Sequence, residues 1–145
     1  NELPLKSNLL YGDKKLHLFD TWTGTPFDDD LCHHKKGEWS ASLDECKALV
    51  GQGERTHYHE GVFPYSAEGL NDHEFCFVYI DPDTYQTVRD AIKFFWPRLV
   101  FGGKLFFDDY NWLACAGVKK AVDEIFIEDQ RTVIATYNTC IVVKK

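Results

Sequence analysis

The 145-residue chain lacks several features that would point directly to a function. It contains no methionine, and none of its apolar runs approaches the roughly 18 residues that a membrane-spanning helix needs. No signal peptide opens the chain, and no basic stripe runs along it. The net charge is −7, with the acidic residues in short clusters. This charge argues against a nucleic acid or an anionic membrane as the main partner.

Cysteine is present but shows no pattern typical of zinc or disulfide sites. The five cysteines are odd in number, and no two have CxxC spacing. Cys76 and Cys140 lie within apolar strand patterns, where we expect each thiol to behave as a small buried hydrophobe. A reduced, cytoplasmic protein is the simplest interpretation, and it disfavours thiol catalysis.

The composition predicts a single packed domain over residues 1–145. Hydrophobic residues make up 44% of the chain and aromatic residues 15%, which suits a globular core. The chain starts at Asn1 and has no methionine, so we expect it to begin partway into a longer parent or after a processed segment.

The segment Phe75–Tyr110 is the most informative part of the sequence. Cys76–Ile80 is a continuous apolar run, typical of a strand buried on both faces. Apolar residues then recur at helical spacing over Thr84–Leu99. We expect Phe101-Gly102-Gly103 to break this helix before a second strand at Lys104–Phe107. Two strands joined by such a helix should be parallel, with a right-handed crossover.

An acidic cluster follows each of these two strands. Asp81 and Asp83 follow the first strand, and Asp108 and Asp109 follow the second. The carboxyl ends of parallel strands meet at one sheet edge, where open α/β sheets bind ligands. Converging carboxylates need a counter-ion, and an oxygen-preferring cation such as Mg²⁺ fits. Alternatively, Asp81 and Asp83 cap the following helix and Asp108-Asp109 is a solvated turn.

The rest of the chain completes an α/β fold. We predict a strand over 15–19, a helix opened by a Ser42–Glu45 capping box, a strand over 55–59, a helix over 118–126, and a terminal hairpin of strands 132–137 and 140–145. The result is a Rossmann-like sheet, mostly parallel, with an antiparallel C-terminal hairpin and helices on both faces.

The loop from Asp20 to Trp39 invites two further hypotheses. Its length and polarity predict a mobile or lid-like segment; the alternative is an ordered loop pinned by Trp22, Phe27 and Trp39. Its Asp28–Asp30 triplet and His33-His34 pair contain metal-ligand types, but they show no defined ligand spacing.

Four segments of the sequence resemble the macrocin O-methyltransferase family. They are LFDTWTGTPF (18–27), HHKKGEWSASLDECK (33–47), FVYIDPDTYQTVRDAIKFFWPRLVFGGKLFFDDY (77–110) and AGVKKAVDEIF (116–126). The resemblance covers about residues 15–143, and its most specific part is the pairing of IDPDTYQTVRDA with FDDY. The family consists of class I S-adenosylmethionine-dependent enzymes that methylate sugar hydroxyls in bacterial natural-product pathways.

The resemblance implies a role for each acidic cluster. It implies that Asp81, Asp108 and Asp109 hold Mg²⁺ and that Asp83 is the general base toward the sugar hydroxyl. It implies a cofactor site in which the acid ending the first strand hydrogen-bonds the ribose; we assign to that site Asp20, Thr21, Gly24, Ser42 and Gly61. The resemblance implies that the partner is a small hydroxylated metabolite that contains a sugar. A homo-oligomer is a further possibility.

The sequence departs from the family at its beginning. The family's first strand and glycine-rich loop should precede Lys15, but the fourteen residues there contain one glycine and no GxGxG pattern. We therefore expect a gap in the middle of the sheet. Either the missing element belongs to a longer parent, or the chain is a methyltransferase-like domain that lost cofactor binding and acts as a partner module. A Mg²⁺-dependent phosphoryl-transfer or hydrolase domain is a third hypothesis, disfavoured because neither a P-loop nor GxSxG is present.

Overall fold

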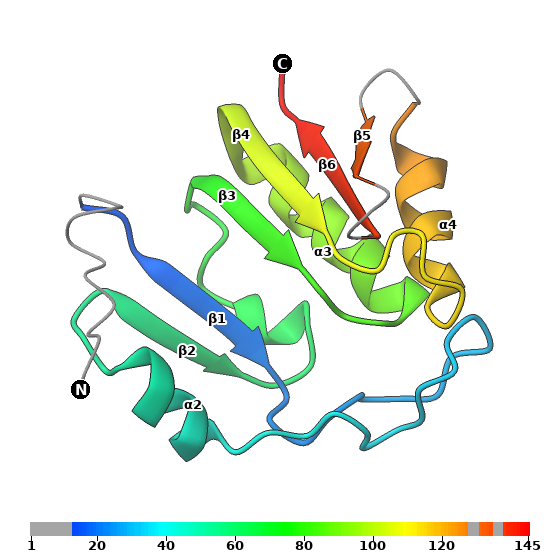
Figure 1. Cartoon of the computed structure of the whole chain (residues 1–145). Helices are drawn as coiled ribbons and strands as arrows, with labels where there is room; N and C mark the ends of the chain where they lie inside the picture. Colours follow the sequence, from blue (N-terminus) through cyan, green and yellow to red (C-terminus); the bar gives the residue numbers. More distant parts are fainter. Residues whose placement is uncertain (1–12, 128–130, 135–137) are drawn as a thin grey trace.

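The computed structural model describes residues 13–127, 131–134 and 138–145 and contains two small sheets (Figure 1). In the first sheet, β1 (Leu16–Asp20) pairs in parallel with β2 (Thr56–Glu60). The second sheet has the strand order β3-β4-β6-β5, with β3 (Phe75–Ile80), β4 (Leu99–Phe107), β5 (Arg131–Ile134) and β6 (Thr139–Val143). The strands β3 and β4 are parallel, whereas β6 is antiparallel to both β4 and β5. The predicted parallel unit and C-terminal hairpin are thus confirmed, although residues 135–137 of the expected strand lie outside the described residues.

The fold is α/β as predicted, but the α-helices of the larger sheet lie on one face only (Figure 1). The elements are α2 (Leu43–Val50), the 3-10 helix η1 (Tyr65–Ala67), α3 (Tyr85–Arg98) and α4 (Ala116–Ile125). Helix α3 packs on α4, and both lie behind the larger sheet in Figure 1. Helix α2 lies beside the smaller sheet, and the Tyr58 hydroxyl of β2 donates to the carbonyl of Gly51 at the end of this helix. None of the described helices is long and apolar enough to cross a bilayer.

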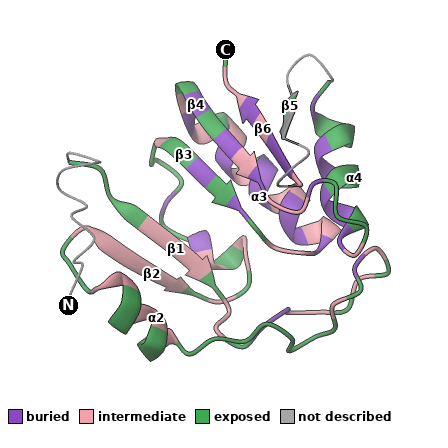
Figure 2. Cartoon of the chain, viewed as in Figure 1, coloured by how far each residue is buried: buried purple, intermediate pink, exposed green. Residues whose placement is uncertain are grey.

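The hydrophobic core belongs almost entirely to the four-stranded sheet and its two helices. Figure 2 shows the buried residues gathered on β3, β4, β6, α3 and α4. The residues with no exposed surface include Val88, Leu105, Phe107, Val122 and Val142. In contrast, β1, β2 and α2 contain no buried residue. The βαβ unit with the acidic edge is therefore the best-packed part of the fold.

The boundary between α3 and β4 differs from the prediction. The helix ends at Arg98 and the strand starts directly at Leu99, so Gly102 and Gly103 lie inside the strand and do not break the helix. Leu99 is only 3% exposed and pairs with Phe75 of β3. Sheet pairing of this buried leucine therefore outweighs the helical periodicity that the sequence continues through it.

The strand β3 is buried on one face only, which corrects a second prediction. Val78 and Ile80 are buried, but Phe77 and Tyr79 are 54% and 51% exposed. Cys76 is also exposed, whereas Cys140 is fully buried as expected. The helices α3 and α4 cover one face of β3, and among the described residues nothing comparable covers the other.

The expected gap in the middle of the sheet is present. Within the part of the chain that the structure describes, no hydrogen-bond ladder joins β1 to β3, so the two sheets stay separate. A cavity of about 500 Å³ lies between these two strands and is lined by residues of both. The two sheets are linked instead by aromatic contacts, including Phe19 of β1 against Phe95 of α3, with ring centroids 5.8 Å apart.

Candidate active site

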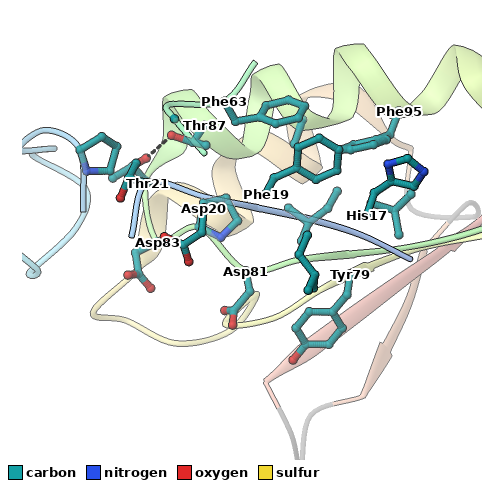
Figure 3. A pocket seen from close by; sticks show the side chains of 18 of the residues that line it. His17, Phe19, Asp20, Thr21, Phe63, Tyr79, Asp81, Asp83, Thr87 and Phe95 are labelled. Atoms are coloured by element: carbon teal, nitrogen blue, oxygen red, sulfur yellow. Dashed lines mark hydrogen bonds between the residues drawn. The ribbon is translucent and has the colours of Figure 1, made fainter. Parts of the chain in front are cut away.

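The cavity between the two sheets is the candidate active site. Its walls carry His17, Phe19 and Asp20 from β1, with Tyr79 of β3 and Asp81 just beyond β3 on the other side (Figure 3). A volume near 500 Å³ is in the range of pockets that hold small ligands. Apolar rings line most of the cavity, and carboxylates stand at the end where the strands finish. A ligand with an apolar or stacking body and polar groups at one end fits this distribution.

Most of the predicted cofactor residues lie at the cavity, but one does not. Asp20, Thr21, Gly24 and Gly61 line it together with residues from β3. Ser42 is not among the lining residues; its hydroxyl accepts from the Glu45 amide at 3.4 Å and caps α2. The half of the capping box in which Ser42 accepts is thus confirmed, while the structure does not bring Ser42 to the cavity.

A tight turn after β1 positions the cofactor-side residues. The Asp20 carboxylate accepts from the Trp22 amide at 2.7 Å, and the Thr21 hydroxyl donates to the Gly24 carbonyl at 2.6 Å. Gly24 has a φ of +85°, and a Cβ there would lie 2.3 Å from the Glu38 carbonyl oxygen. Only glycine fits this close approach without moving the backbone. The turn therefore fixes the Asp20 carboxylate at the end of β1.

The four predicted acidic residues gather at the carboxyl ends of β3 and β4. The Asp108 amide donates to the Ile80 carbonyl at 3.0 Å, which ties the two strand ends together. Desolvation by the surrounding protein, followed by the charges of Asp108, Asp109 and Asp83, raises the pKa of Asp81 to about 7. Desolvation and the charges of Asp108 and Asp83 also raise the pKa of Asp109. These carboxylates repel one another, as expected of a site that attracts a cation.

The acidic edge fits a hydrated magnesium ion better than a closed cage. Asp81, Asp108 and Asp109 are coupled through their charges, but among the described residues they do not form a close set of three potential metal ligands. Mg²⁺ characteristically keeps several water ligands and takes one or two carboxylates directly. In addition, the Tyr79 hydroxyl donates a short hydrogen bond to Asp108 and orients that carboxylate toward the same edge.

Asp83 does not cap α3, which excludes one of the alternatives raised by the sequence. The N-cap residue is Thr84, whose side chain makes no capping bond, and the Tyr85 amide donates instead to Asp29 at 2.8 Å. The Asp83 carboxylate accepts from the Cys115 thiol at 3.4 Å. Because Asp29 from the long loop does the capping, Asp83 is left for another role.

The loop after β1 is held by contacts that favour the ordered alternative. Thr25 exchanges backbone hydrogen bonds with Glu38 and Gly37, at 2.8 and 2.9 Å. The backbones of Cys32 and Cys115 form an isolated antiparallel β-bridge, not a disulfide, and this pairing brings the loop against the start of α4. Of the expected aromatic pins, Trp39 is 73% exposed. Whether the loop moves on ligand binding stays a prediction.

The sequence analysis did not identify two residues that the β-bridge between Cys32 and Cys115 places beside Asp83. His34 and Cys115 lie beside its carboxylate, although they are far apart in the sequence. The His33-His34 pair next to an acidic triplet indicated potential metal ligands, but the sequence did not show which distant residues they contact. No local pattern predicts that the loop crosses to the start of α4.

A parallel βαβ unit with carboxylates at its edge and a cavity beside the neighbouring strand is typical of methyltransferase-type α/β folds. The comparison with protein families agrees: residues 5–110 match the family described as a methyltransferase domain, and the chain belongs to this family. The comparison with curated proteins found no match.

Several solved structures share the fold. The chain is similar to the O-methyltransferase NovP, with a TM-score of 0.77 and 17% identity, covering 97% of this chain and 64% of that one. It is also similar to the calicheamicin methyltransferase CalS11, with a TM-score of 0.69 and 19% identity, covering 89% and 60%. A caffeoyl-CoA O-methyltransferase-like protein from Staphylococcus aureus gives 0.55 and 15%, covering 70% and 57%. The chain thus spans less than two thirds of the length of each of these structures.

Proposed function

We propose that the protein is an S-adenosylmethionine-dependent, Mg²⁺-dependent O-methyltransferase that acts on a hydroxyl of a sugar or another small metabolite. The observation that carries this proposal is the carboxylate edge at Asp81, Asp108 and Asp109, with Asp83 beside it and a ligand-sized cavity next to it. Membership of the methyltransferase-domain family supports the reaction class. The solved relatives named for O-methylation, one of them a TDP-rhamnose 3'-O-methyltransferase, support a sugar-like acceptor, in line with the macrocin-type motifs.

The chemistry of O-methylation matches the residues at this edge. A sugar hydroxyl is a poor nucleophile at neutral pH, so the reaction gains from a base that takes its proton. Asp83 would accept that proton while the hydroxyl oxygen forms its bond to the methyl carbon and the sulfonium sulfur leaves with the bonding electrons. Mg²⁺ at Asp81, Asp108 and Asp109 would supply Lewis acidity that lowers the pKa of the hydroxyl.

The opposite wall of the cavity would hold the cofactor. Asp20 ends β1, in the position from which an acidic residue hydrogen-bonds ribose hydroxyls in dinucleotide-type sites. Thr21, Gly24 and Gly61 form the adjoining wall. The acceptor then lies toward Asp83, so that the methyl group is transferred across the cavity.

Mg²⁺ titration by calorimetry tests the metal site. We expect Asp81→Asn and Asp108→Asn to weaken Mg²⁺ binding by about tenfold or more, because each removes a charge and a ligand. Asp72→Asn, at an exposed position away from the edge, is the matched control. Measurement at about pH 8 keeps Asp81 ionised, since its pKa lies near 7. Unchanged affinity in both edge variants would rule out the site.

A second candidate function is a methyltransferase-like domain that binds a partner and not the cofactor. Thermal unfolding with S-adenosylhomocysteine separates the two candidates. An intact cofactor site should raise the Tm with ligand concentration, because a ligand that binds only the folded state stabilises it by mass action. Wild-type protein that shows no shift, together with an Asp20→Asn variant that behaves identically, would favour the binding module.

A further inference from the structure

Next to the acidic edge, three residues from separate segments bring together three different kinds of metal ligand. His34 comes from the loop after β1, Asp83 from the loop after β3, and Cys115 from the residue before α4. One ligand atom from each residue lies within 4.8 Å of the other two. Among the residues that the structure describes, no other set of three potential ligands meets this spacing.

The surrounding backbone builds this cluster. Cys115 has no exposed surface, and its thiol already points at Asp83, to which it donates at 3.4 Å. Two backbone contacts fix the loop that carries His34. One is the β-bridge between Cys32 and Cys115, and the other is the hydrogen bond that the His33 amide donates to the Ala114 carbonyl at 2.8 Å. The His34 side chain is only 14% exposed. The three side chains are therefore held together by long-range contacts and do not meet through chance rotation of surface groups.

We propose that His34, Asp83 and Cys115 form a binding site for a borderline-soft divalent cation such as Zn²⁺, separate from the Mg²⁺ edge. Imidazole and thiolate are ligands for Zn²⁺ and related transition metals, whereas Mg²⁺ takes oxygen ligands. Three protein ligands leave a fourth tetrahedral position for water or a ligand atom.

The spacing suits a tetrahedral ion. With zinc–ligand bonds of about 2.0–2.3 Å, neighbouring ligand atoms of a tetrahedral site lie roughly 3.3–3.8 Å apart. The observed upper limit of 4.8 Å needs only small side-chain movements to close. Binding replaces the thiol proton: Cys115 releases one proton to solvent as its sulfur bonds to the metal, and the Asp83 oxygen exchanges a hydrogen bond for a metal bond.

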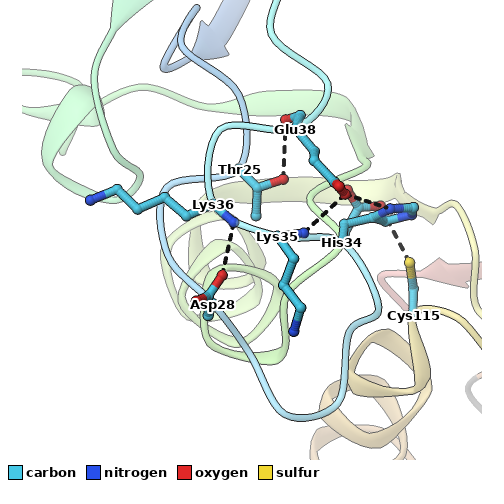
Figure 4. A network of polar contacts seen from close by, with 8 residues as sticks. Thr25, Asp28, His34, Lys35, Lys36, Glu38 and Cys115 are labelled. Atoms are coloured by element: carbon cyan, nitrogen blue, oxygen red, sulfur yellow. Dashed lines mark hydrogen bonds and ion pairs between the residues drawn. The ribbon is translucent and has the colours of Figure 1, made fainter.

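A carboxylate stands behind the histidine. Figure 4 shows the Glu38 carboxylate paired with His34. Its oxygen lies 3.5 Å from Nδ1 of His34 and also accepts from the Lys35 amide at 3.0 Å. Carboxylates that pair with one nitrogen of a metal-bound imidazole orient the ring and strengthen it as a ligand. Glu38 is therefore a positioning residue of the proposed site.

The site shares Asp83 with the proposed methyl transfer. A cation bound there occupies the carboxylate that would otherwise take the acceptor proton, so it should inhibit the reaction without competing for the Mg²⁺ edge. This consequence rests on the proposed function. The binding itself does not, and it is measured separately.

Cobalt substitution tests the binding, because Co²⁺ bound by a thiolate gives a charge-transfer absorption in the near ultraviolet. We expect the wild-type chain, reduced and free of other metals, to give this band at one equivalent of Co²⁺ and to lose it when Zn²⁺ is added. Cys115→Ser should abolish the band. Cys46→Ser, in α2 away from the cluster, is the thiol control and should keep it.

A histidine pair provides the second test, which does not disturb the buried thiol. We expect His34→Ala to weaken Zn²⁺ affinity by at least about tenfold in calorimetry, and its exposed neighbour His33→Ala to leave the affinity unchanged. Circular dichroism establishes that each variant is folded. The proposal is overturned if the wild type gives no thiolate–cobalt band, or if folded His34→Ala binds Zn²⁺ as tightly as His33→Ala. If Zn²⁺ binds as expected but no methyl transfer is found, the site stands and the proposed function fails.

Discussion

The two walls of the cavity differ in how firmly the protein holds them. The wall formed by β3 and the residues after it rests on a packed core, in which Leu105 and Phe107 of the adjacent β4 are fully buried. The wall formed by β1 belongs to a two-stranded sheet without a buried residue and joins the core mainly through the ring of Phe19. In the proposed function, the residues that take part in the chemistry lie on the rigid wall, and the residues that bind the cofactor lie on the looser one.

The two walls also differ in the charges they collect. Four carboxylates crowd the rigid wall, and their repulsion adds to desolvation in raising the pKa of Asp81. The looser wall carries a histidine cluster, in which His17 stacks on His57 and His59. Crowded acids and crowded bases respond to protons in opposite ways, so pH should separate the two walls experimentally.

Exchanging one carboxylate on each wall should give the largest difference. We expect Asp83→Asn to lower kcat by about 10²- to 10⁴-fold, because the amide cannot accept the acceptor's proton. Asp20→Asn should instead raise KM for S-adenosylmethionine by roughly tenfold, because it weakens hydrogen bonds of a charged acceptor to the ribose. Steady-state kinetics with both substrates varied measures the two effects.

Asp83→Asn does not disturb the start of α3, since Asp29 and not Asp83 accepts from the Tyr85 amide. The variant should therefore be at least as stable to denaturant as the wild type, since it also removes one of the charges that raise the pKa of Asp81. Undiminished methyl transfer by a folded Asp83→Asn protein would remove Asp83 from the mechanism and leave the base unassigned.

A matched pair of leucines compares the packing of the two walls. Leu105→Ala should reduce the free energy of unfolding by about 2–5 kcal/mol, the cost of a cavity in a closed core. Leu18→Ala, on β1 and only partly buried, should cost about 1 kcal/mol or less, because solvent fills the space. Urea denaturation measures both; equal losses would mean that the two sheets form one equally packed unit.

The sequence predicted the rigid wall better than the looser one, for a physical reason. Local periodicity predicts the strand, helix and strand of residues 75–107. Parallel pairing of the two strands then places the acidic residues that follow them at one edge of the sheet. Which strand face stays uncovered depends on where helices pack, so the exposure of Phe77 and Tyr79 was not predictable from an apolar run. The meeting of His34 with Cys115 depends on a long-range bridge, and no spacing rule encodes it.

The histidine cluster should make the looser wall sensitive to acid. Burial, followed by the neighbouring charges of His57, His59, His73 and Lys15, lowers the pKa of His17 from 6.5 to about 4. Between these values the unfolded chain binds more protons than the folded one, so stability falls as pH drops from 6.5 through 4. In urea denaturation, His17→Gln should flatten this dependence. His33→Gln, at an exposed position, is the control. If the free energy of unfolding of His17→Gln depends on pH as strongly as that of the wild type, the histidine cluster does not cause the acid sensitivity.

The rigid wall should respond in the opposite direction. The pKa of Asp81 is about 7 in the folded chain and 3.8 as an isolated group, so the folded state binds more protons between these values. Stability therefore falls as pH rises from 3.8 through 7, which is the reverse of the His17 effect. The effect is smaller than the pKa shift alone implies, because Asp81 retains contact with solvent, which screens the repulsion.

Asp81→Asn removes the charge that causes this loss. Without metal, the variant should unfold at a higher urea concentration than the wild type at about pH 8 and at the same concentration below about pH 4, where the wild-type carboxyl is protonated as well. With added Mg²⁺ the wild type should unfold at the higher urea concentration, because Mg²⁺ binding stabilises it and the variant lacks one ligand for the ion. Asp72→Asn should follow the wild type in every condition. If Asp81→Asn gains no stability at the higher pH and Mg²⁺ stabilises both proteins equally, then the acids at this edge neither repel one another nor share a cation.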